Sequence, residues 1–342
     1  MPKVSFVVAI YGVEAYIERC VRSLYGQTLE DIEIVLVNDC TPDDSIGIAL
    51  RALEEYPERK QQVKIVQHSE NTGTHVVRRD GAKAATGEYV INIDGDDYAE
   101  ERMAEAMYAK AKATDADIVL CGFWHYRDNS RCYFMPVPLS TLGDPEAMRD
   151  ATLNRVGWPN VWCRMMKREL LLSDKMIWPV ASHAEDVIIT SVATFYAKKI
   201  AGVEEPLYNY YRYPNSMANG NSEEQRLKRL RAEEQNNQVL FRFFEQQRVS
   251  EKYQYGIIVN KARTRNELFP LMNKLKYCRL WRRTYPELNK VMLLGNGAFV
   301  STYREKIWWL ALTFGQGPRF RKYLLSKRLR PELVWRRGVE RY

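Results

Sequence analysis

Apolar runs and amphipathic stretches alternate along the first part of the chain. Each apolar run is short and rich in β-branched residues, which is typical of a buried strand, and each amphipathic stretch has apolar positions at helical spacing. The expected strands span residues 3–10, 32–37, 63–67 and 89–93, and the expected helices span residues 14–25, 44–56 and 74–85. Strand and helix recur at intervals of roughly 30 residues, which indicates βαβ units and a parallel sheet.

The pattern beyond residue 100 predicts further elements and a second region. A helix is expected at 100–114, a strand at 118–126, irregular structure to Pro138, short helices at 145–153 and 168–172, and a helix at 184–196. From Ser222 to about Glu251 the chain is polar and rich in Glu, Gln, Arg and Leu, which suggests a helical appendage. We therefore expect two domains, residues 1–218 and 219–342, with a boundary near Pro214 and Gly220.

Polar loops follow three of the expected strands. Asp39 ends the second strand, residues 71–73 follow the third, and residues 94–97 follow the fourth. Sites in parallel sheets lie beyond the carboxyl ends of the strands, so these loops are expected to converge on one crevice although they are far apart in sequence.

The loop after the fourth strand carries three carboxylates, Asp94, Asp96 and Asp97. Like charges this close repel one another, and a cation compensates them. Alternation in an extended segment places Asp94 and Asp96 on the same side, where they can share one divalent ion, and oxygen ligands alone favour Mg²⁺ or Mn²⁺. The alternative is an acidic turn in which Asp97 caps the next helix.

Basic charge is concentrated at the end of the chain. The net charge is +8, and residues 301–342 hold eleven Lys or Arg and three Asp or Glu, whereas residues 1–300 hold 40 of each sign and sum to zero. Aromatic residues interleave with the basic ones, which is typical of amphipathic helices on anionic membranes. The alternative is a helix that docks on the protein with its basic face in water. Nucleic acid is not an expected partner, because no nucleic-acid-binding fold is recognisable.

Apolar runs and cysteines predict the compartment. The first apolar run, and the run at 307–314, are too short for a signal peptide or a spanning helix. The six cysteines show neither CxxC pairing nor zinc spacing. We expect reduced thiols in a cytoplasmic protein that is peripheral on the inner face of the cell membrane.

Several stretches match one family in order and spacing over about residues 1–215. They are residues 2–11, 23–28, 34–45, 70–73, 84–89, 94–97, 167–171, 185–186, 206–208 and 211–212, with Trp162. These stretches resemble family 2 glycosyltransferases. The resemblance implies an α/β chain with a GT-A fold, in which a mostly parallel central sheet is flanked by helices. It also implies a nucleotide-sugar donor, a divalent metal and inversion at the anomeric carbon. Residues 216–342 match no family, and a helical extension is expected there.

The resemblance assigns donor contacts residue by residue. Tyr11 corresponds to a residue that stacks on the uracil of a UDP-sugar, although a strand-end aromatic can also pack on the core. Asp39 corresponds to the carboxylate that accepts from the base N3–H. Arg78 corresponds to an arginine that reaches the diphosphate or the acidic loop; its alternative is a solvated helix face. The remaining nucleotide-sugar contacts are Ala9, Asn71 and Asp94.

The resemblance also assigns the metal and the chemistry. Asp96 is the expected direct ligand of Mn²⁺ or Mg²⁺, and Asp94 supports it. Asp186 is the expected base that takes the acceptor's proton, and Glu185 contacts a sugar. The alternative for this pair is an acidic helix start that interacts with the helix dipole. The chain departs from the family at Thr72, where a second glycine is common, and at Arg79, where asparagine is usual.

Three functions follow from these patterns. The first is an inverting glycosyltransferase that moves a sugar from a UDP-sugar to a glycan or a polyprenyl-diphosphate-linked acceptor in surface polysaccharide synthesis. The second is a catalytically inactive peripheral-membrane scaffold of a polysaccharide assembly complex, which the presence of Asp94, Asp96 and Asp186 disfavours. The third is a nucleotidyltransferase, but residues 11–14 lack the glycine-rich basic motif that it requires after the first strand.

Overall fold

The computed structural model describes residues 1–127, 130–211, 222–271 and 274–289, and they separate into two compact units. The division falls between Ser216 and Met217, inside a segment outside the described residues, so the boundary expected at residue 218 stays a prediction. The basic tail at 301–342 also lies outside them. None of the described helices is long and apolar enough to cross a membrane.

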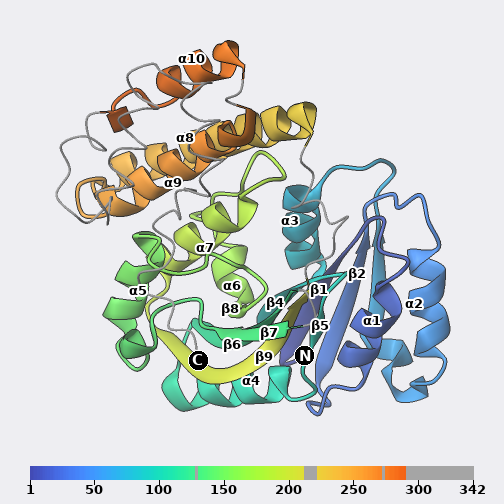
Figure 1. The fold of residues 1–342 in the computed structure, drawn as a ribbon. Helices are drawn as coiled ribbons and strands as arrows, with labels where there is room; N and C mark the ends of the chain where they lie inside the picture. The colour runs from blue at the N-terminus through green and yellow to red at the C-terminus, as the bar shows by residue number, and fades with distance from the viewer. Residues whose placement is uncertain (128–129, 212–221, 272–273, 290–342) are drawn as a thin grey trace. The chain divides into compact units, whose positions relative to one another are not determined.

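A mixed sheet forms the centre of the first unit (Figure 1). Its strands run in the order β3 (Val63–Gln67), β2 (Ile32–Asn38), β1 (Val4–Ile10), β4 (Tyr89–Asp94), β8 (Arg164–Lys167), β6 (Ile118–Arg127), β9 (Ile200–Tyr211) and β5 (Tyr98–Ala99), with β7 (Ser130–Phe134) paired to β6. The strands β3, β2, β1 and β4 are parallel, as the alternating pattern predicts. Beyond β4 the sheet is mixed, because β8 pairs antiparallel with both β4 and β6.

Helices cover both faces of this sheet. They are α1 (Ile17–Tyr25), α2 (Ser45–Leu53), α3 (Thr74–Ala84), α4 (Met103–Thr114), α5 (Pro145–Leu153), α6 (Arg168–Leu171) and α7 (Glu185–Tyr196). Along β1, Phe6 and Val8 belong to the core shared with α1, α2 and α4, whereas Val7 faces α3. Gly81 allows α3 to approach closely, because a Cβ there would lie 2.2 Å from Val7 Cγ1.

The structure corrects the prediction for the segment before Pro138. That segment was expected to be irregular, but it contains β7, which forms a hairpin with β6 and places Phe134 opposite Phe123. Three of the five β7 residues are exposed, so β7 lacks the apolar run that marks a buried strand. The short strands β5 and β8 were also not expected, since two and four residues are too few to show a period. The strand β9 was not expected either, because the exposed Glu204 and Glu205 interrupt its apolar positions.

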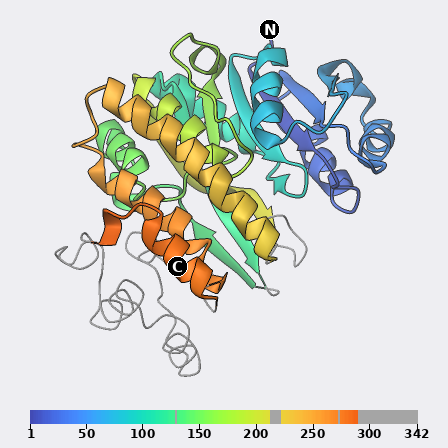
Figure 2. The ribbon, with the colours of Figure 1, turned by 90° about the horizontal axis from the view of Figure 1, so that it is seen from above.

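The second unit is helical, with α8 (Glu223–Gln246), α9 (Gln254–Asn266), a 3₁₀ turn η4 (Phe269–Leu271) and α10 (Leu275–Arg283). Figure 2 shows α8 as the long gold helix of this unit. A capping box fixes its start, because the Ser222 hydroxyl accepts from the Gln225 N–H while the Gln225 side chain accepts from the Ser222 N–H. The helical extension expected after residue 219 is therefore confirmed for the described residues.

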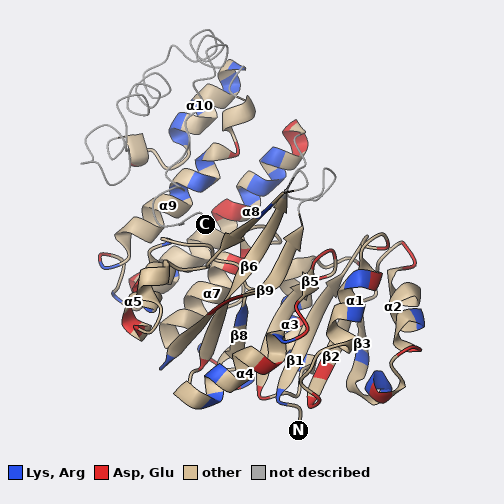
Figure 3. Ribbon diagram, turned by 60° about the horizontal axis from the view of Figure 1, so that its bottom comes forward, with Lys and Arg blue, Asp and Glu red and all other residues tan. Residues whose placement is uncertain are grey.

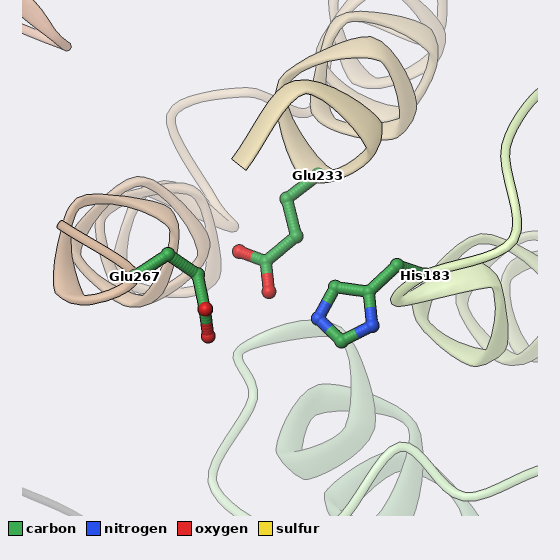
Figure 4. Close-up of side chains that lie close together, drawn as sticks. All are labelled: His183, Glu233 and Glu267. Carbon is green, nitrogen blue, oxygen red and sulfur yellow. The ribbon is translucent and has the colours of Figure 1, made fainter. Parts of the chain in front are cut away.

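Two carboxylates of the second unit, Glu233 of α8 and Glu267 after α9, approach within 4.8 Å (Figure 4). Arg229 pairs with Glu267 at 2.9 Å, and Arg263 lies 3.8 Å from Glu233. Each carboxylate is thus compensated by an arginine of its own unit, as buried charges usually are. His183, drawn in the same figure, belongs to the first unit.

Candidate active site

The carboxyl ends of β1, β2 and β4 meet at one edge of the sheet. The register pairs Ala9 of β1 with both Val37 of β2 and Asp94 of β4. Asp39 directly follows β2, and Tyr11 directly follows β1. Tyr11 is 45% exposed, so its ring is accessible rather than packed on the core. Four of the predicted donor residues therefore lie on or directly after adjacent strands, although their contacts with a donor stay predictions.

Gly95 brings the acidic loop close to β1. A Cβ at this position would lie 2.8 Å from the Ala9 carbonyl oxygen and 3.0 Å from Val13 Cγ2, so a larger residue requires a shift. The loop then turns, with the Asp97 N–H donating to the Asp94 carbonyl at 3.0 Å. The close approach of the loop to β1 thus explains why a glycine lies between Asp94 and Asp96.

Asp39 is buried and holds the loop between β3 and α3. Its Oδ1 accepts from the Thr72 N–H at 2.8 Å and lies 2.9 Å from His68 Nδ1, while its Oδ2 accepts from the Gly73 N–H at 2.8 Å. Burial raises the pKa of Asp39, but the hydrogen bonds from His68, Thr72 and Gly73 outweigh burial and hold the pKa below its ordinary value. Sequence reasoning missed His68 and saw Thr72 only as a departure from the family. Asn71 of this loop is exposed.

The metal candidates combine burial with mutual repulsion. Burial, then the charge of Asp94, raises the pKa of Asp96 to about 6, and the opposing effect of Arg19 and Arg78 is smaller. Within the described residues, the three aspartates of this loop do not bring three ligand atoms within 4.8 Å of one another. An oxygen-only donor set of two carboxylates fits Mg²⁺ or Mn²⁺, since both ions usually keep water and phosphate oxygens as further ligands.

Asp97 is a buried anchor and not a helix cap. Its carboxylate accepts from the Tyr208 hydroxyl at 2.8 Å and from the Tyr211 N–H at 2.7 Å, and α4 begins only at Met103. Burial and the neighbouring aspartates raise the pKa of Asp97 well above its ordinary value. Asp97 therefore fixes the acidic loop to the end of β9, and the capping alternative is wrong.

Arg78 connects the acidic loop with the second carboxylate pair. It is 3% exposed, so it does not lie on a solvated helix face. Its Nη2 donates to Asp94 Oδ1 at 2.9 Å and lies 3.6 Å from Asp186 Oδ1, while its Nε lies 3.7 Å from Glu185 Oε1. Burial lowers the pKa of Arg78, but the three carboxylates outweigh it, so the guanidinium stays charged. One buried cation thus serves three carboxylates from two distant segments.

Asp186 lies in the first turn of α7, and neighbouring charges and burial determine its pKa. Burial raises the pKa of Asp186, Arg78 lowers it, and Glu185 and Asp94 raise it again, to about 7. Its Oδ2 accepts from the Val161 N–H at 3.3 Å. A carboxylate with a pKa near neutrality is suited to accept a proton in a reaction at neutral pH. The preceding Ala184 has φ +58, a conformation that non-glycine residues rarely adopt.

A second contact, which sequence reasoning missed, joins α3 to the segment before α7. His75 Nδ1 lies 2.7 Å from Ser182 Oγ. The same hydroxyl packs on Gly73, where a Cβ would lie 2.1 Å from Ser182 Oγ and where φ is +88. No signal in the sequence links these residues, because they are more than a hundred positions apart. The loop between β3 and α3, for which donor contacts are predicted (the donor loop), is therefore in direct contact with the segment before α7.

Residues 5–172 match the model of the family described as Glycosyl transferase family 2. The chain carries a family 2 glycosyltransferase domain. It is 37% identical over 227 residues to "Uncharacterized glycosyltransferase EpsJ" of Bacillus subtilis (strain 168), a match that covers 64% of this chain and 63% of the relative. It is 29% identical over 213 residues to a poly(ribitol-phosphate) beta-glucosyltransferase of Bacillus spizizenii, over 61% of this chain and 32% of the relative. The chain thus spans less than two thirds of these relatives' lengths.

Solved structures confirm the GT-A fold of this chain. Residues 1–349 of S. aureus TarS in complex with UDP superpose with a TM-score of 0.54 and 19% identity, covering 96% of this chain and 91% of that one. A mannosyltransferase from Pyrobaculum calidifontis in complex with GDP-Man and Mn²⁺ gives a TM-score of 0.51 and 16% identity, covering 96% and 86%. At these identities the likeness concerns the fold alone.

Proposed function

We propose that the first unit is an inverting glycosyltransferase that moves a sugar from a UDP-sugar to an acceptor hydroxyl. The observation that carries this proposal is the position of Arg78 between Asp94 on the donor side and Asp186 on α7. A donor-side carboxylate and a candidate base are thereby held at one point by residues from β4, α3 and α7. A family 2 domain with this arrangement has the parts that sugar transfer requires.

In the proposed reaction, Asp186 accepts the proton of the acceptor hydroxyl. The acceptor oxygen forms a bond to the anomeric carbon on the face opposite the leaving group, the bond from that carbon to the diphosphate oxygen breaks, and the diphosphate leaves with the electron pair. Arg78 orients Asp186 through their ion pair. When bound by Asp96 and Asp94, Mn²⁺ or Mg²⁺ would supply positive charge to the leaving diphosphate.

The donor base is proposed to be uracil. Tyr11 offers an exposed ring after β1, and Asp39 is buried directly after β2. Among the described residues, Oδ2 of Asp39 accepts one hydrogen bond, which leaves acceptor capacity for the base N3–H. The two structural neighbours hold UDP and GDP-Man respectively, so the fold does not choose the base. The transferred sugar is proposed to be a hexose or an N-acetylhexosamine.

The acceptor is proposed to be a glycan or a polyprenyl-diphosphate-linked glycan in surface polysaccharide synthesis. This follows the family resemblance and the names of relatives such as the poly(ribitol-phosphate) beta-glucosyltransferase. We place the protein in the cytoplasm, peripheral on the inner face of the membrane, with residues 301–342 as one contact with the anionic membrane. The competing inactive scaffold would need no base, whereas Asp186 has a pKa of about 7 beside a buried arginine.

Calorimetric titration of the full chain with UDP, GDP and CDP, each with Mn²⁺, tests the donor. We expect UDP to bind at least tenfold more tightly than GDP, because the larger guanine does not match the Asp39 and Tyr11 contacts. A matched titration with UDP and excess chelator should show weaker binding. Tighter binding of GDP would overturn the donor assignment, and full UDP affinity without metal would overturn the metal assignment.

A further inference from the structure

The helix α10 has two faces of opposite character. Tyr277, Cys278 and Trp281 are buried, at 4%, 3% and 0% exposure, and they attach α10 to the second unit. The other face is exposed and carries Leu275 and Leu280, which are 52% and 37% exposed. Both leucines are among the most exposed large apolar side chains of the described residues. Packing within the second unit therefore leaves much of both leucine side chains uncovered.

Basic residues lie between these two leucines, because Leu275 and Leu280 are about 140° apart around the helix. Lys276, Arg279 and Arg283 are exposed, Arg282 is half-buried, and α10 contains no acidic residue. Figure 3 shows basic but no acidic positions on this helix. Lys276 pairs with Glu223 at 3.1 Å, whereas no ion pair is found for Arg279 or Arg283 among the described residues. The exposed face is thus cationic along its centre with one leucine at each edge, so that basic side chains can reach lipid headgroups while the leucines flank them.

The charge of the surrounding chain has the same sign. Residues 222–300 hold 16 Lys or Arg and 8 Asp or Glu, a net of +8, whereas residues 1–221 hold 24 and 32, a net of −8. The neutral sum over residues 1–300 therefore conceals an acidic first region and a basic second one. The tail at 301–342 adds another +8, so like charges disfavour the tail as the partner of this face.

We propose that the exposed face of α10 is a contact site for anionic phospholipid, independent of residues 301–342. Arginine and lysine attract the headgroups, and the two leucines enter the boundary between headgroups and acyl chains. A purely polyanionic partner would not require the leucines. The proposal names a partner surface for the proposed glycosyltransferase, but it concerns lipid binding alone and does not depend on the nucleotide or on transfer.

Sedimentation of the full chain with vesicles tests this site. The vesicles contain phosphatidylglycerol and phosphatidylcholine in equal amounts, with pure phosphatidylcholine as the neutral comparison. We expect Arg279→Glu/Arg283→Glu to weaken binding to the anionic vesicles at least tenfold. The matched control is Arg231→Glu/Arg242→Glu, which makes the same change of charge at exposed positions of α8 and is expected to change binding less than threefold.

A second variant separates insertion from simple charge attraction. Leu275→Ser/Leu280→Ser keeps the net charge, and we expect it to lose the fraction of binding that survives in high salt, where charge attraction is screened. Melting temperature and UDP affinity should be unchanged in all three variants, so a folding defect or a failure of the proposed donor would be recognised separately.

Three results would overturn the lipid site. Equal losses in the α10 and α8 charge variants would show that only the total charge matters. Unchanged vesicle binding in the α10 variants would assign the contact to the tail. Salt-dependent self-association without vesicles that is lost in Arg279→Glu/Arg283→Glu would assign the face to the acidic region of a second copy.

Discussion

The two acidic regions of the candidate site are built in opposite ways. Asp39 is supplied with hydrogen bonds from His68, Thr72 and Gly73, and its pKa is lowered. Asp96 and Asp186 are half-buried among other carboxylates, and their pKa values are raised to about 6 and about 7. A saturated carboxylate stabilises the fold, whereas an uncompensated one opposes folding until a cation or a proton arrives. The same residue type thus provides a fixed anchor in one region and reactive groups in the other.

The largest effect is expected at the candidate base. Asp186→Asn should lower transfer by about 10²–10⁴-fold, because the amide cannot accept the acceptor's proton. Donor affinity should stay within about threefold, since the loss falls on the transition state alone. Turnover and calorimetric donor affinity measure the two quantities. Unchanged turnover would exclude Asp186 as the base. An equal loss of turnover in Glu185→Gln would contradict the assignment of Asp186 alone as the base.

The next effect is the pH dependence of the metal region. Asp96 has a folded pKa above its unfolded value of about 3.9, so it opposes folding increasingly as pH rises from about 4 to 6, by at most about 3 kcal/mol. Mn²⁺ should therefore stabilise the wild-type chain more at pH 7 than at pH 5. Asp96→Asn should be more stable than wild type without metal and should lose most of the metal response.

Thermal unfolding with and without Mn²⁺, at both pH values, measures this. The matched control is Asp44→Asn, an exposed carboxylate paired with Arg51 at 2.6 Å, which should keep the full metal response. A metal response of Asp96→Asn equal to that of wild type would exclude Asp96 as a ligand.

The opposite sign is expected for Asp39. Asp39→Asn should destabilise the fold by about 1–3 kcal/mol, because the amide group cannot accept all the hydrogen bonds that the buried carboxylate accepts. The folded pKa lies below the unfolded value, so the contribution is present above about pH 4 and is lost as pH falls further. Urea unfolding at pH 7 and pH 3 measures it; a difference from wild type that is the same at both pH values would contradict the account.

The smallest effect tests whether the two regions are coupled. Ser182→Ala removes the contact between His75 and the segment before α7, and we expect turnover to fall about three- to tenfold with little change in donor affinity. Ser182→Thr keeps a hydroxyl and should restore part of the loss. Ser69→Ala, in an exposed loop position, is the control and should have no effect. A loss in donor affinity without a loss in turnover would mean that the contact serves only the donor loop.

The sequence was most informative where a strand is an uninterrupted run of buried residues. Each of β1, β2 and β4 has six or seven residues, nearly all buried, so the apolar pattern located them to within one residue. The antiparallel part was not predicted, because β8 has four residues and gains its strand conformation from pairing with β4 and β6 on either side. A pairing between segments that are far apart in sequence leaves no local period.

The candidate site divides in the same way. The chain by itself, through its resemblance to a family, identified the candidate site residues, because their types and order match the chemistry of sugar transfer. These residues include Asp39, Arg78, Asp94 and Asp186. Only the tertiary structure decided what each carboxylate does, since burial and partners from other segments set its charge. Thr72 saturates Asp39, Tyr208 ties down Asp97, and Arg78 is shared among three carboxylates. These contacts join residues up to 111 positions apart, and the pKa of a carboxyl group depends on such neighbours rather than on the residues beside it in the chain.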